Sequence, residues 1–183
     1  MYRGLAIHFL DKGIRAEETE KVIEACKDAD VKIRYEDGVQ QVYLNGTNIT
    51  GRLRDEAVGQ MTSKCSVLPA VRSKLLDLQR ELARTQDVIM DGRDIGTCVL
   101  PCADVKVYLT ASVRTRAKRR YDELTAKGET CDLEEIARDI RERDERDMNR
   151  ETAPLKQAED AVLVDSSDMT IDEVVRTIAG LCR

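Results

Sequence analysis

Residues 88–97 read Val-Ile-Met-Asp-Gly-Arg-Asp-Ile-Gly-Thr, so three apolar residues run directly into charged residues and two glycines. The apolar triplet predicts a short buried strand, and similar runs follow at residues 105–109 and 161–165. Helical patterns separate the three runs, which is the alternation typical of a mostly parallel sheet. The sequence therefore predicts an α/β fold.

The first half of the chain is predicted to be helical around one β-hairpin. From Val31 to Leu44 apolar residues alternate with polar ones, and Asp37-Gly38 and Asn45-Gly46 are typical hairpin turns. Helical patterns cover about residues 5–12, 17–28, 55–64, 69–84 and, near the end of the chain, 171–181. Because no strand or capping residue precedes the first helix, the chain is expected to begin inside a longer pattern.

Composition restricts the class of function. The 183 residues fit one α/β domain with a modest insertion. A net charge of −5 and an aromatic content of 3% disfavour a protein that binds a polyanion or stacks on bases. Six cysteines form no Cys-x-x-Cys pair and His8 is the single histidine, so no protein-held metal is expected. We also expect the thiols to be reduced, no segment to span a membrane and the protein to be cytoplasmic.

Charged side chains follow the strand predicted at residues 88–90. Ligands of open parallel sheets bind beyond the carboxyl ends of the strands, and glycines permit tight backbone paths there. Asp91, Arg93 and Asp94 are therefore candidate ligand-binding residues. The alternative is an ordinary strand-to-helix turn with an aspartate as its cap, but two aspartates and an arginine within four residues favour a functional site.

A second candidate site lies on a helix predicted from about residue 133. Apolar residues from Leu133 to Ile140 follow the three-to-four residue spacing that marks one face of a helix. Continued at that spacing, the same face carries Arg143, Asp147 and Arg150. Either these side chains point toward the core side, or they form a solvated ladder of salt bridges worth about 0.3–0.5 kcal/mol per pair.

Residues 114–150 are the most charged part of the chain, with eleven Lys and Arg against eleven Asp and Glu. A nucleic-acid arm would be basic on balance, so this segment is interpreted as a helical hairpin over a site or as a solvated surface. Other single residues carry less information. For Arg3, Arg72, Ser63 and His8, solvent exposure, a helix end or a structural role is favoured over ligand binding. Arg116, Arg119 and Arg120 could face either a phosphate or water.

Taken together, these motifs resemble the bacterial-type cytidylate kinases in order and spacing. The resemblance rests on Tyr2-Arg3, Ser63 with Arg72, the 91–97 motif, the run 141–150 and Ala153-Pro154-Leu155. It covers essentially the whole chain, and the later motifs are specific. It implies the fold of the P-loop nucleoside monophosphate kinases, a mostly parallel sheet with helices on both faces and a small insertion that contains the β-hairpin.

The resemblance also implies a reaction, the transfer of the γ-phosphate of ATP to CMP or dCMP with Mg²⁺ on the ATP phosphates. Guanidinium groups match phosphate oxygens in pairs, which suits an arginine-rich site. The arginines implied to hold the CMP phosphate are Arg3, Arg93 and Arg150. Those implied to contact ATP from a lid are Arg116 and Arg119.

The remaining implied residues select the nucleoside. Arg143 and Asp147 would lie at the ribose, and Asp91 is counted among the substrate-binding residues. Asp94 would accept a hydrogen bond from the cytosine amino group, whereas uracil presents an oxygen there. Ser63 and Arg72 would donate to the acceptors of the base.

The implied organisation is a single domain, residues 1–183. It would contain a CMP-binding insertion at about residues 26–70 and a lid at about residues 114–143. A monomer that acts on small molecules, with neither nucleic acid nor membrane as a partner, is expected.

One departure from the family pattern concerns the ATP side. The family begins with a strand, a phosphate loop of the form Gly-x4-Gly-Lys-Ser/Thr and a helix, all upstream of the tyrosine-arginine pair, and the 183 residues contain no such loop. The first strand and the phosphate loop are thus expected to be missing, and residues 1–183 alone to show little kinase activity. An inactive CMP-binding fragment is one alternative, and an Arg-rich nucleic-acid-binding or interaction protein is another.

Overall fold

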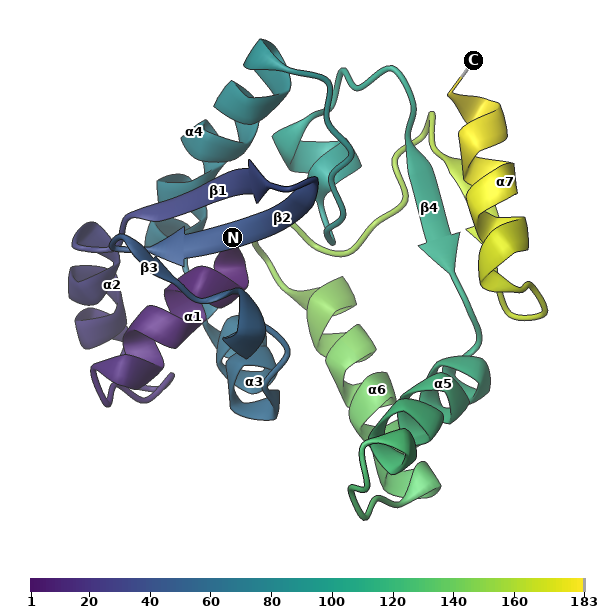
Figure 1. Cartoon of the computed structure of the whole chain (residues 1–183), viewed down its shortest axis with the longest axis horizontal. Helices are drawn as coiled ribbons and strands as arrows, with labels where there is room; N and C mark the ends of the chain where they lie inside the picture. Colours follow the sequence, from purple (N-terminus) through teal and green to yellow (C-terminus); the bar gives the residue numbers. More distant parts are fainter. Residues whose placement is uncertain (183) are drawn as a thin grey trace. The chain divides into compact units, whose positions relative to one another are not determined.

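The structure, a computed structural model, describes residues 1–182. It divides into two compact units, unit 1 (Met1–Val88) and unit 2, which begins at Ile89 (Figure 1). The elements of unit 1 are α1 (Tyr2–Asp11), α2 (Thr19–Lys27), β1 (Val31–Glu36), β2 (Val39–Leu44), β3 (Thr47–Asn48), η1 (Thr50–Arg52), α3 (Glu56–Cys65) and α4 (Pro69–Thr85). The elements of unit 2 are η2 (Ile95–Val99), β4 (Val107–Thr110), α5 (Val113–Ala126), α6 (Leu133–Asn149), β5 (Val162–Asp165) and α7 (Ile171–Leu181).

The predicted hairpin of unit 1 is confirmed. β1 and β2 pair antiparallel with Val31 opposite Leu44, and β2 pairs antiparallel with β3. Both predicted turns have positive φ at their two central residues, 52° and 76° at Asp37-Gly38 and 48° and 82° at Asn45-Gly46. This geometry matches the right-handed twist of the flanking strands, which is why Asp-Gly and Asn-Gly stand there.

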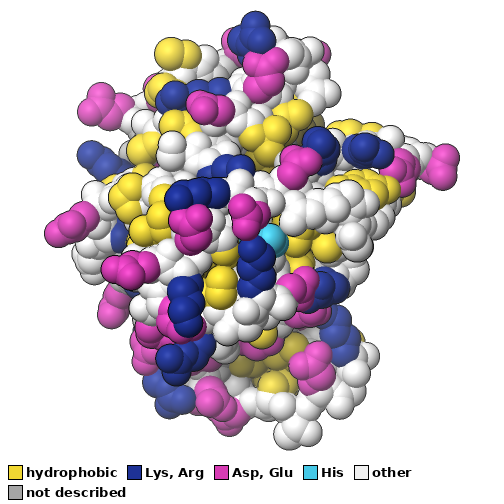
Figure 2. Space-filling view, turned by 90° about the vertical axis from the view of Figure 1, so that its left-hand side faces the viewer, with side chains coloured by type: hydrophobic (Ala, Val, Ile, Leu, Met, Phe, Trp, Pro, Cys, Tyr) yellow, Lys and Arg dark blue, Asp and Glu magenta, His cyan; other side chains and the backbone are white. Residues whose placement is uncertain are grey.

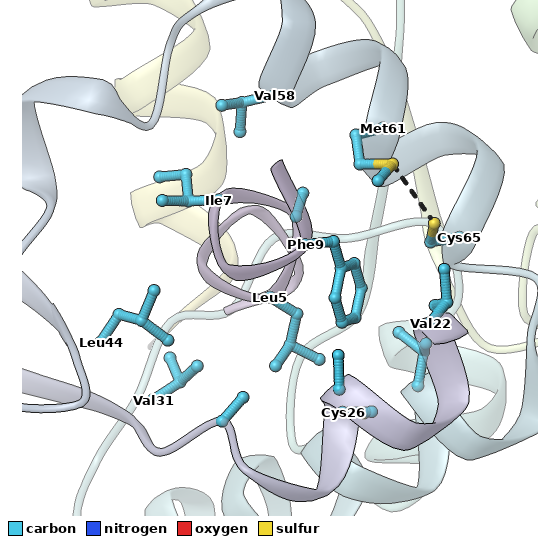
Figure 3. Close-up of a cluster of buried hydrophobic side chains, with 14 of the residues drawn as sticks. Leu5, Ile7, Phe9, Val22, Cys26, Val31, Leu44, Val58, Met61 and Cys65 are labelled. Atoms are coloured by element: carbon cyan, nitrogen blue, oxygen red, sulfur yellow. Dashed lines mark hydrogen bonds between the residues drawn. The ribbon is translucent and has the colours of Figure 1, made fainter. Parts of the chain in front are cut away.

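Helix α1 forms the centre of the core of unit 1. Leu5, Ile7 and Phe9 are each 0% exposed, and Figure 3 shows them among apolar side chains of the surrounding elements. A helix that is apolar on all sides must be covered on all sides. Accordingly α2, β2, α3 and α4 all contact α1.

The single histidine also lies on α1. His8 is 6% exposed, and its Nε2 has no hydrogen-bond partner within residues 1–182. Burial, followed by the positive charge of Lys12, lowers the pKa of His8 below its ordinary value, while the backbone of Ala25 and the carboxylates of Asp28 and Asp11 oppose the shift. The structure thus holds this imidazole in its neutral form.

The stability of the chain should therefore depend on pH. Because the unfolded chain takes up the proton of His8 more readily than the folded one, the free energy of unfolding should fall as the pH drops below about 6.5. His8→Leu removes the titrating group and should flatten this decline between about pH 7.5 and pH 5.5. Urea unfolding curves of both proteins measure the difference. An equally steep decline in the variant would contradict the assignment to His8.

Unit 2 confirms parallel pairing for two of the three predicted strands. β4 and β5 are parallel, with Val107 opposite Val162 and Thr110 opposite Asp165. Their carboxyl ends therefore lie at one edge. Hydrogen bonds from the Ser167 hydroxyl and backbone N–H lower the pKa of Asp165 at that edge.

The prediction of a strand at residues 88–90 is wrong for the described structure. These residues belong to no strand, and Ile89 is 97% exposed. A strand requires a hydrogen-bonded neighbour, and residues 1–182 pair none with this segment. An apolar pattern indicates that a segment can be buried, but it does not identify the neighbouring strand that would pair with it.

The charged segment of unit 2 folds as two helices in contact, α5 and α6. The Ser112 hydroxyl caps α5 by accepting from the Thr115 N–H at 3.1 Å, and the Asp132 carboxylate caps α6 by accepting from the Glu135 N–H at 2.8 Å. Such caps satisfy N–H groups that have no partner inside the helix. The predicted helical hairpin is confirmed, whereas its role as a lid stays a prediction.

No helix within residues 1–182 is both long enough and apolar enough to cross a bilayer. All six cysteines lie in this part of the chain and are free. Burial raises the pKa of the Cys65 thiol to about 11 and also raises that of Cys26, so both thiols stay protonated near neutral pH.

Candidate functional site

The 91–97 motif forms a tight turn ahead of η2. Gly92 is required there, because a Cβ atom would lie 2.8 Å from Cγ1 of Ile95. The Asp94 backbone carbonyl accepts the Cys98 N–H at 2.8 Å, but the Asp94 side chain makes no capping hydrogen bond. The alternative interpretation, an aspartate whose side chain caps the turn, therefore does not describe this residue.

Helix α6 carries the apolar face and the charged face as one continuous helix. Its bounds, Leu133–Asn149, include the predicted apolar and charged residues of this face except Arg150, which directly follows the helix. Ala137 is buried in the first half, and Asp147 is buried in the second at 4% exposure. The prediction that Asp147 points the way the core-facing residues point is confirmed.

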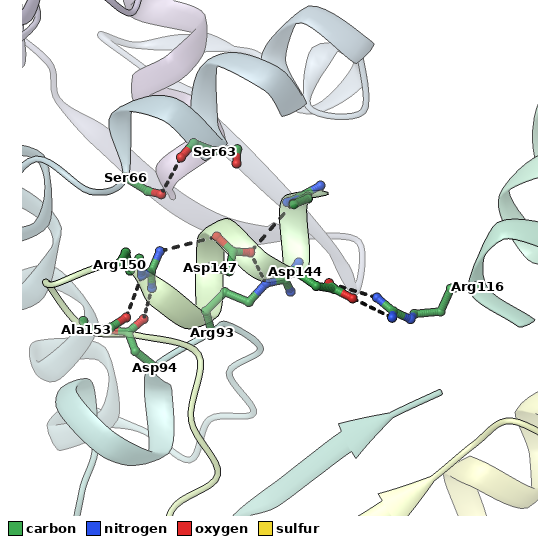
Figure 4. Close-up of polar contacts among 10 residues, drawn as sticks. Ser63, Ser66, Arg93, Asp94, Arg116, Asp144, Asp147, Arg150 and Ala153 are labelled. Atoms are coloured by element: carbon green, nitrogen blue, oxygen red, sulfur yellow. Dashed lines mark hydrogen bonds and ion pairs between the residues drawn. The ribbon is translucent and has the colours of Figure 1, made fainter. Parts of the chain in front are cut away.

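Three arginines surround the buried carboxylate of Asp147. Arg93 donates from Nε to Oδ2 at 2.9 Å, while Arg150 Nη1 lies 3.7 Å from Oδ1 and Arg143 Nε lies 4.0 Å from Oδ2. Arg150 Nη2 is also 4.0 Å from Asp94 Oδ1. Figure 4 shows Arg150 between the two aspartates, with Arg93 on the other side of Asp147. We call these five residues the Asp147 network.

The Asp147 network combines features of both sequence interpretations. The contacts of Asp147 with Arg143 and Arg150 are intrahelical or at the helix end, as in a ladder. However, the side chains of Asp147, Asp94 and Arg150 are each only 6% exposed, and Arg93 reaches in from 54 residues away. Charges are rarely buried unless they are paired. A solvated ladder therefore does not account for this cluster.

The Asp147 network contains three guanidinium groups and two carboxylates. Within residues 1–182 Arg93 makes its hydrogen bond from Nε, and its side chain is 44% exposed. An arginine carries five N–H donors, so the Nη groups of Arg93 remain available to an anion. Excess positive charge with accessible donors suits a small phosphorylated ligand.

The two arginines expected to contact ATP are engaged by protein groups. Arg116 binds the Asp144 carboxylate through both Nη atoms at 3.0 and 2.6 Å and the Ala111 carbonyl through Nε at 2.9 Å. Arg119 donates to the Ser166 carbonyl at 2.6 Å and to the Met169 carbonyl at 3.3 Å. These contacts tie α5 to α6 and to the loop after β5. Any role at ATP stays a prediction.

Two of the expected site residues of unit 1, Arg3 and Arg72, lie near the start of α1, and Ser63 lies on α3. Arg3 donates from Nη1 to the Leu53 carbonyl at 2.5 Å, and Arg72 donates from Nη1 to the Ser66 carbonyl at 3.2 Å. The Arg72 guanidinium also lies over the Tyr2 ring, 5.8 Å from its centre. Ser63 is buried at 6% exposure. Their roles at a substrate stay predictions, as does that of Asp91, which is exposed.

The sequence interpretation missed two contributors. Asp144, the partner of Arg116, lies on the same face of α6, because a three-to-four residue spacing from Ile140 admits residue 144 as well as 143. The Ala153 carbonyl accepts from Arg150 Nε at 2.7 Å. The first was recoverable from the spacing, whereas no sequence signal marks the second.

A fold with a parallel strand pair and a buried arginine-rich cluster fits enzymes that handle phosphorylated small molecules. A sequence model of the cytidylate kinase family matches residues 1–183. The chain is 42% identical to the cytidylate kinase of Caldicellulosiruptor saccharolyticus over 99% of its own length and 80% of that relative. It is 44% identical to the enzyme of Leuconostoc mesenteroides over 99% and 81%, and 45% identical to that of Magnetococcus marinus over 99% and 80%.

The chain belongs to the cytidylate kinase family, so the resemblance noted from its motifs is confirmed. It is accordingly an α/β enzyme of the phosphotransferase class.

Proposed function

We propose that this chain transfers the γ-phosphate of ATP to CMP or dCMP, which yields CDP or dCDP. The Asp147 network is the observation that carries the proposal, because it places acceptors and donors suited to each part of a cytidine monophosphate in one compact unit. Phosphoryl transfer requires the reacting groups to be held in line and their negative charge to be offset. The arginines of the network can do both.

The phosphate of CMP is proposed to bind Arg93 and Arg150. Arg93 keeps its Nη donors accessible while the Asp147 carboxylate holds its Nε. A guanidinium that is fixed at Nε presents its other donors as a preformed fork, which lowers the cost of ordering it on binding. Asp147 thus orients the phosphate-binding arginine in addition to any contact with substrate.

The two aspartates of the network are proposed to recognise the nucleoside through hydrogen bonds. Asp147, with Arg143 beside it, can accept from ribose hydroxyls. Asp94 can accept from the amino group of cytosine but would face an oxygen of uracil. A buried acceptor left without a donor costs about 1–3 kcal/mol, enough to disfavour UMP.

ATP is proposed as the donor, with Mg²⁺ held mainly by its phosphates, as is usual in kinases. Residues 1–182 contain no group of three or more His, Cys, Asp or Glu side chains placed to hold a metal ion by themselves. Bound MgATP would supply the phosphoryl group and offset charge. The α5–α6 pair is proposed to serve as the lid that excludes water, a competing acceptor.

We also propose that the chain acts as a cytoplasmic monomer on small molecules only. Figure 2 shows acidic and basic side chains interspersed on the face that it displays, and the most charged segment, residues 114–150, balances its basic residues with acidic ones and so is not a continuous basic tract. A partner that binds through phosphate backbones requires such a tract. A CMP-binding role for residues 26–70 stays part of the proposal.

A comparison of CMP, dCMP and UMP as phosphate acceptors tests the proposed function. Equilibrium titrations should give a dissociation constant for CMP and for dCMP at least about tenfold lower than for UMP, because one unpaired buried acceptor is worth about a factor of ten. With MgATP added, the small amount of product expected from residues 1–183 should form faster from CMP, as CDP, than from UMP, as UDP, which chromatography can measure. Equal affinities and rates for CMP and UMP would contradict the proposal.

A further inference from the structure

The segment that follows α6 folds back against the end of the helix. Arg150 ends α6 with an extended backbone, φ −67° and ψ 141°. Five residues later, the Leu155 N–H donates to the Asp147 carbonyl at 2.8 Å. This bond closes a short loop, residues 151–154, over the residue that carries the central carboxylate.

Ala153 has an unusual backbone within this loop. Its φ is +49°, in the left-handed region, which is unfavourable for a residue that bears a Cβ. The other such non-glycine residues within 1–182 are Asp37 and Asn45, both in hairpin turns and of the types that tolerate this conformation. Ala153 also precedes Pro154, whose ring favours an extended residue before it. Such a conformation persists only where surrounding contacts require it.

The contact that the loop makes is with Arg150. Arg150 Nε donates to the Ala153 carbonyl at 2.7 Å. The ion pairs of Arg150 with Asp147 and Asp94, at 3.7 and 4.0 Å, are longer than hydrogen bonds. Charge attraction at those distances has little directional preference. The Ala153 carbonyl is therefore the group that sets the plane of the guanidinium.

We propose that Ala153 is a positioning residue for the phosphate-binding arginine of this site. Its left-handed backbone delivers the carbonyl that fixes Arg150 between Asp94 and Asp147, and a guanidinium held in this way is preorganised for the CMP phosphate that it is proposed to bind. The inference rests on the proposed function of the Asp147 network. It adds that the backbone of the 151–154 loop, and not the carboxylates alone, determines the affinity for the phosphate.

Two substitutions at residue 153 distinguish the effect of its backbone conformation from the effect of its side chain. Valine is β-branched and is strongly disfavoured at positive φ, so Ala153→Val should move the carbonyl and weaken CMP binding about tenfold. Glycine adopts positive φ freely, so Ala153→Gly should retain CMP binding within about threefold. Cytidine has no phosphate, and its affinity should change less than twofold in either variant. Equilibrium titration gives all of these constants.

A double variant tests whether Ala153 acts through Arg150. Lysine has no Nε donor at the matching position, so Arg150→Lys should itself weaken CMP binding, and Ala153→Val should then add less than about twofold. Circular dichroism melting curves identify a variant that fails to fold. Equal effects of Ala153→Val with arginine and with lysine at position 150, or equal losses for CMP and cytidine, would overturn the positioning role. Failure of the unaltered chain to bind CMP would instead overturn the proposed function.

Discussion

Asp147→Asn should lower the free energy of unfolding by about 3 kcal/mol and weaken CMP binding by more than tenfold. The carboxylate is 6% exposed and is shared by three arginines, one of which, Arg150, is equally buried. Removing one partner of a buried ion pair leaves the other charge without compensation, which costs about 3–5 kcal/mol. The lower figure is expected here because Arg93 and Arg143 are 44% and 41% exposed, so water can take over part of their solvation.

The expected loss also has a functional component. Without the carboxylate, the Nε of Arg93 loses its acceptor at 2.9 Å, and the guanidinium that is proposed to meet the phosphate becomes free to rotate. Asparagine keeps the shape of the side chain and retains one acceptor oxygen, so the effect reports mainly on charge. Urea unfolding followed by circular dichroism measures the stability, and titration with CMP measures the affinity.

Asp139→Asn is the matched control on the same helix. Asp139 is exposed on α6, so its substitution should change the free energy of unfolding by no more than about 0.5 kcal/mol. If Asp147→Asn proved as mild as this control, the Asp147 network would have to be regarded as a solvated ladder of the ordinary kind.

Much of the fold was predictable because local chemistry decides it. Positive φ at Asp-Gly and Asn-Gly places the hairpin, and Pro69 at the first turn of α4 marks where that helix begins. The apolar and charged face of α6 could be predicted because residues three or four positions apart lie on the same face of a helix, whatever that face contacts. The spacing placed Asp147 on this face but left open whether it is buried or solvated, and the structure shows that it is buried.

The sequence could not identify the tertiary contacts that each segment or side chain makes. The apolar run at residues 88–90 lies outside any strand, and Leu109, Leu163 and Val175 are apolar yet more than half exposed. The acceptors of Arg116 and Arg119 are likewise tertiary contacts, formed by residues 28 and 47 positions away. Ala153 is the clearest case, because the residue before a proline is expected to be extended, and only the contacts around it account for its left-handed backbone.

Asp94 is proposed to select cytosine over uracil. The aspartate is 5% exposed and lies next to the arginine that is proposed to bind phosphate, with Arg150 Nη2 at 4.0 Å from its carboxylate. As a carboxylate it can only accept hydrogen bonds, which favours the amino group of cytosine. An asparagine can turn its amide to accept from cytosine or to donate to the oxygen of uracil. Asp94→Asn should therefore reduce the preference for CMP over UMP.

The ratio of the affinity for CMP to that for UMP, measured by equilibrium titration of the unaltered chain and of Asp94→Asn, is the direct test of this selection. The ratio should fall by at least about tenfold, with much of the change coming from a gain with UMP, because an unpaired acceptor costs about 1–3 kcal/mol. Asp94→Ala should also lower the ratio, and Asp104→Asn, an exposed aspartate of the same unit, should leave it unchanged. Equal losses for both substrates in Asp94→Asn, with the ratio preserved, would show that Asp94 does not read the base.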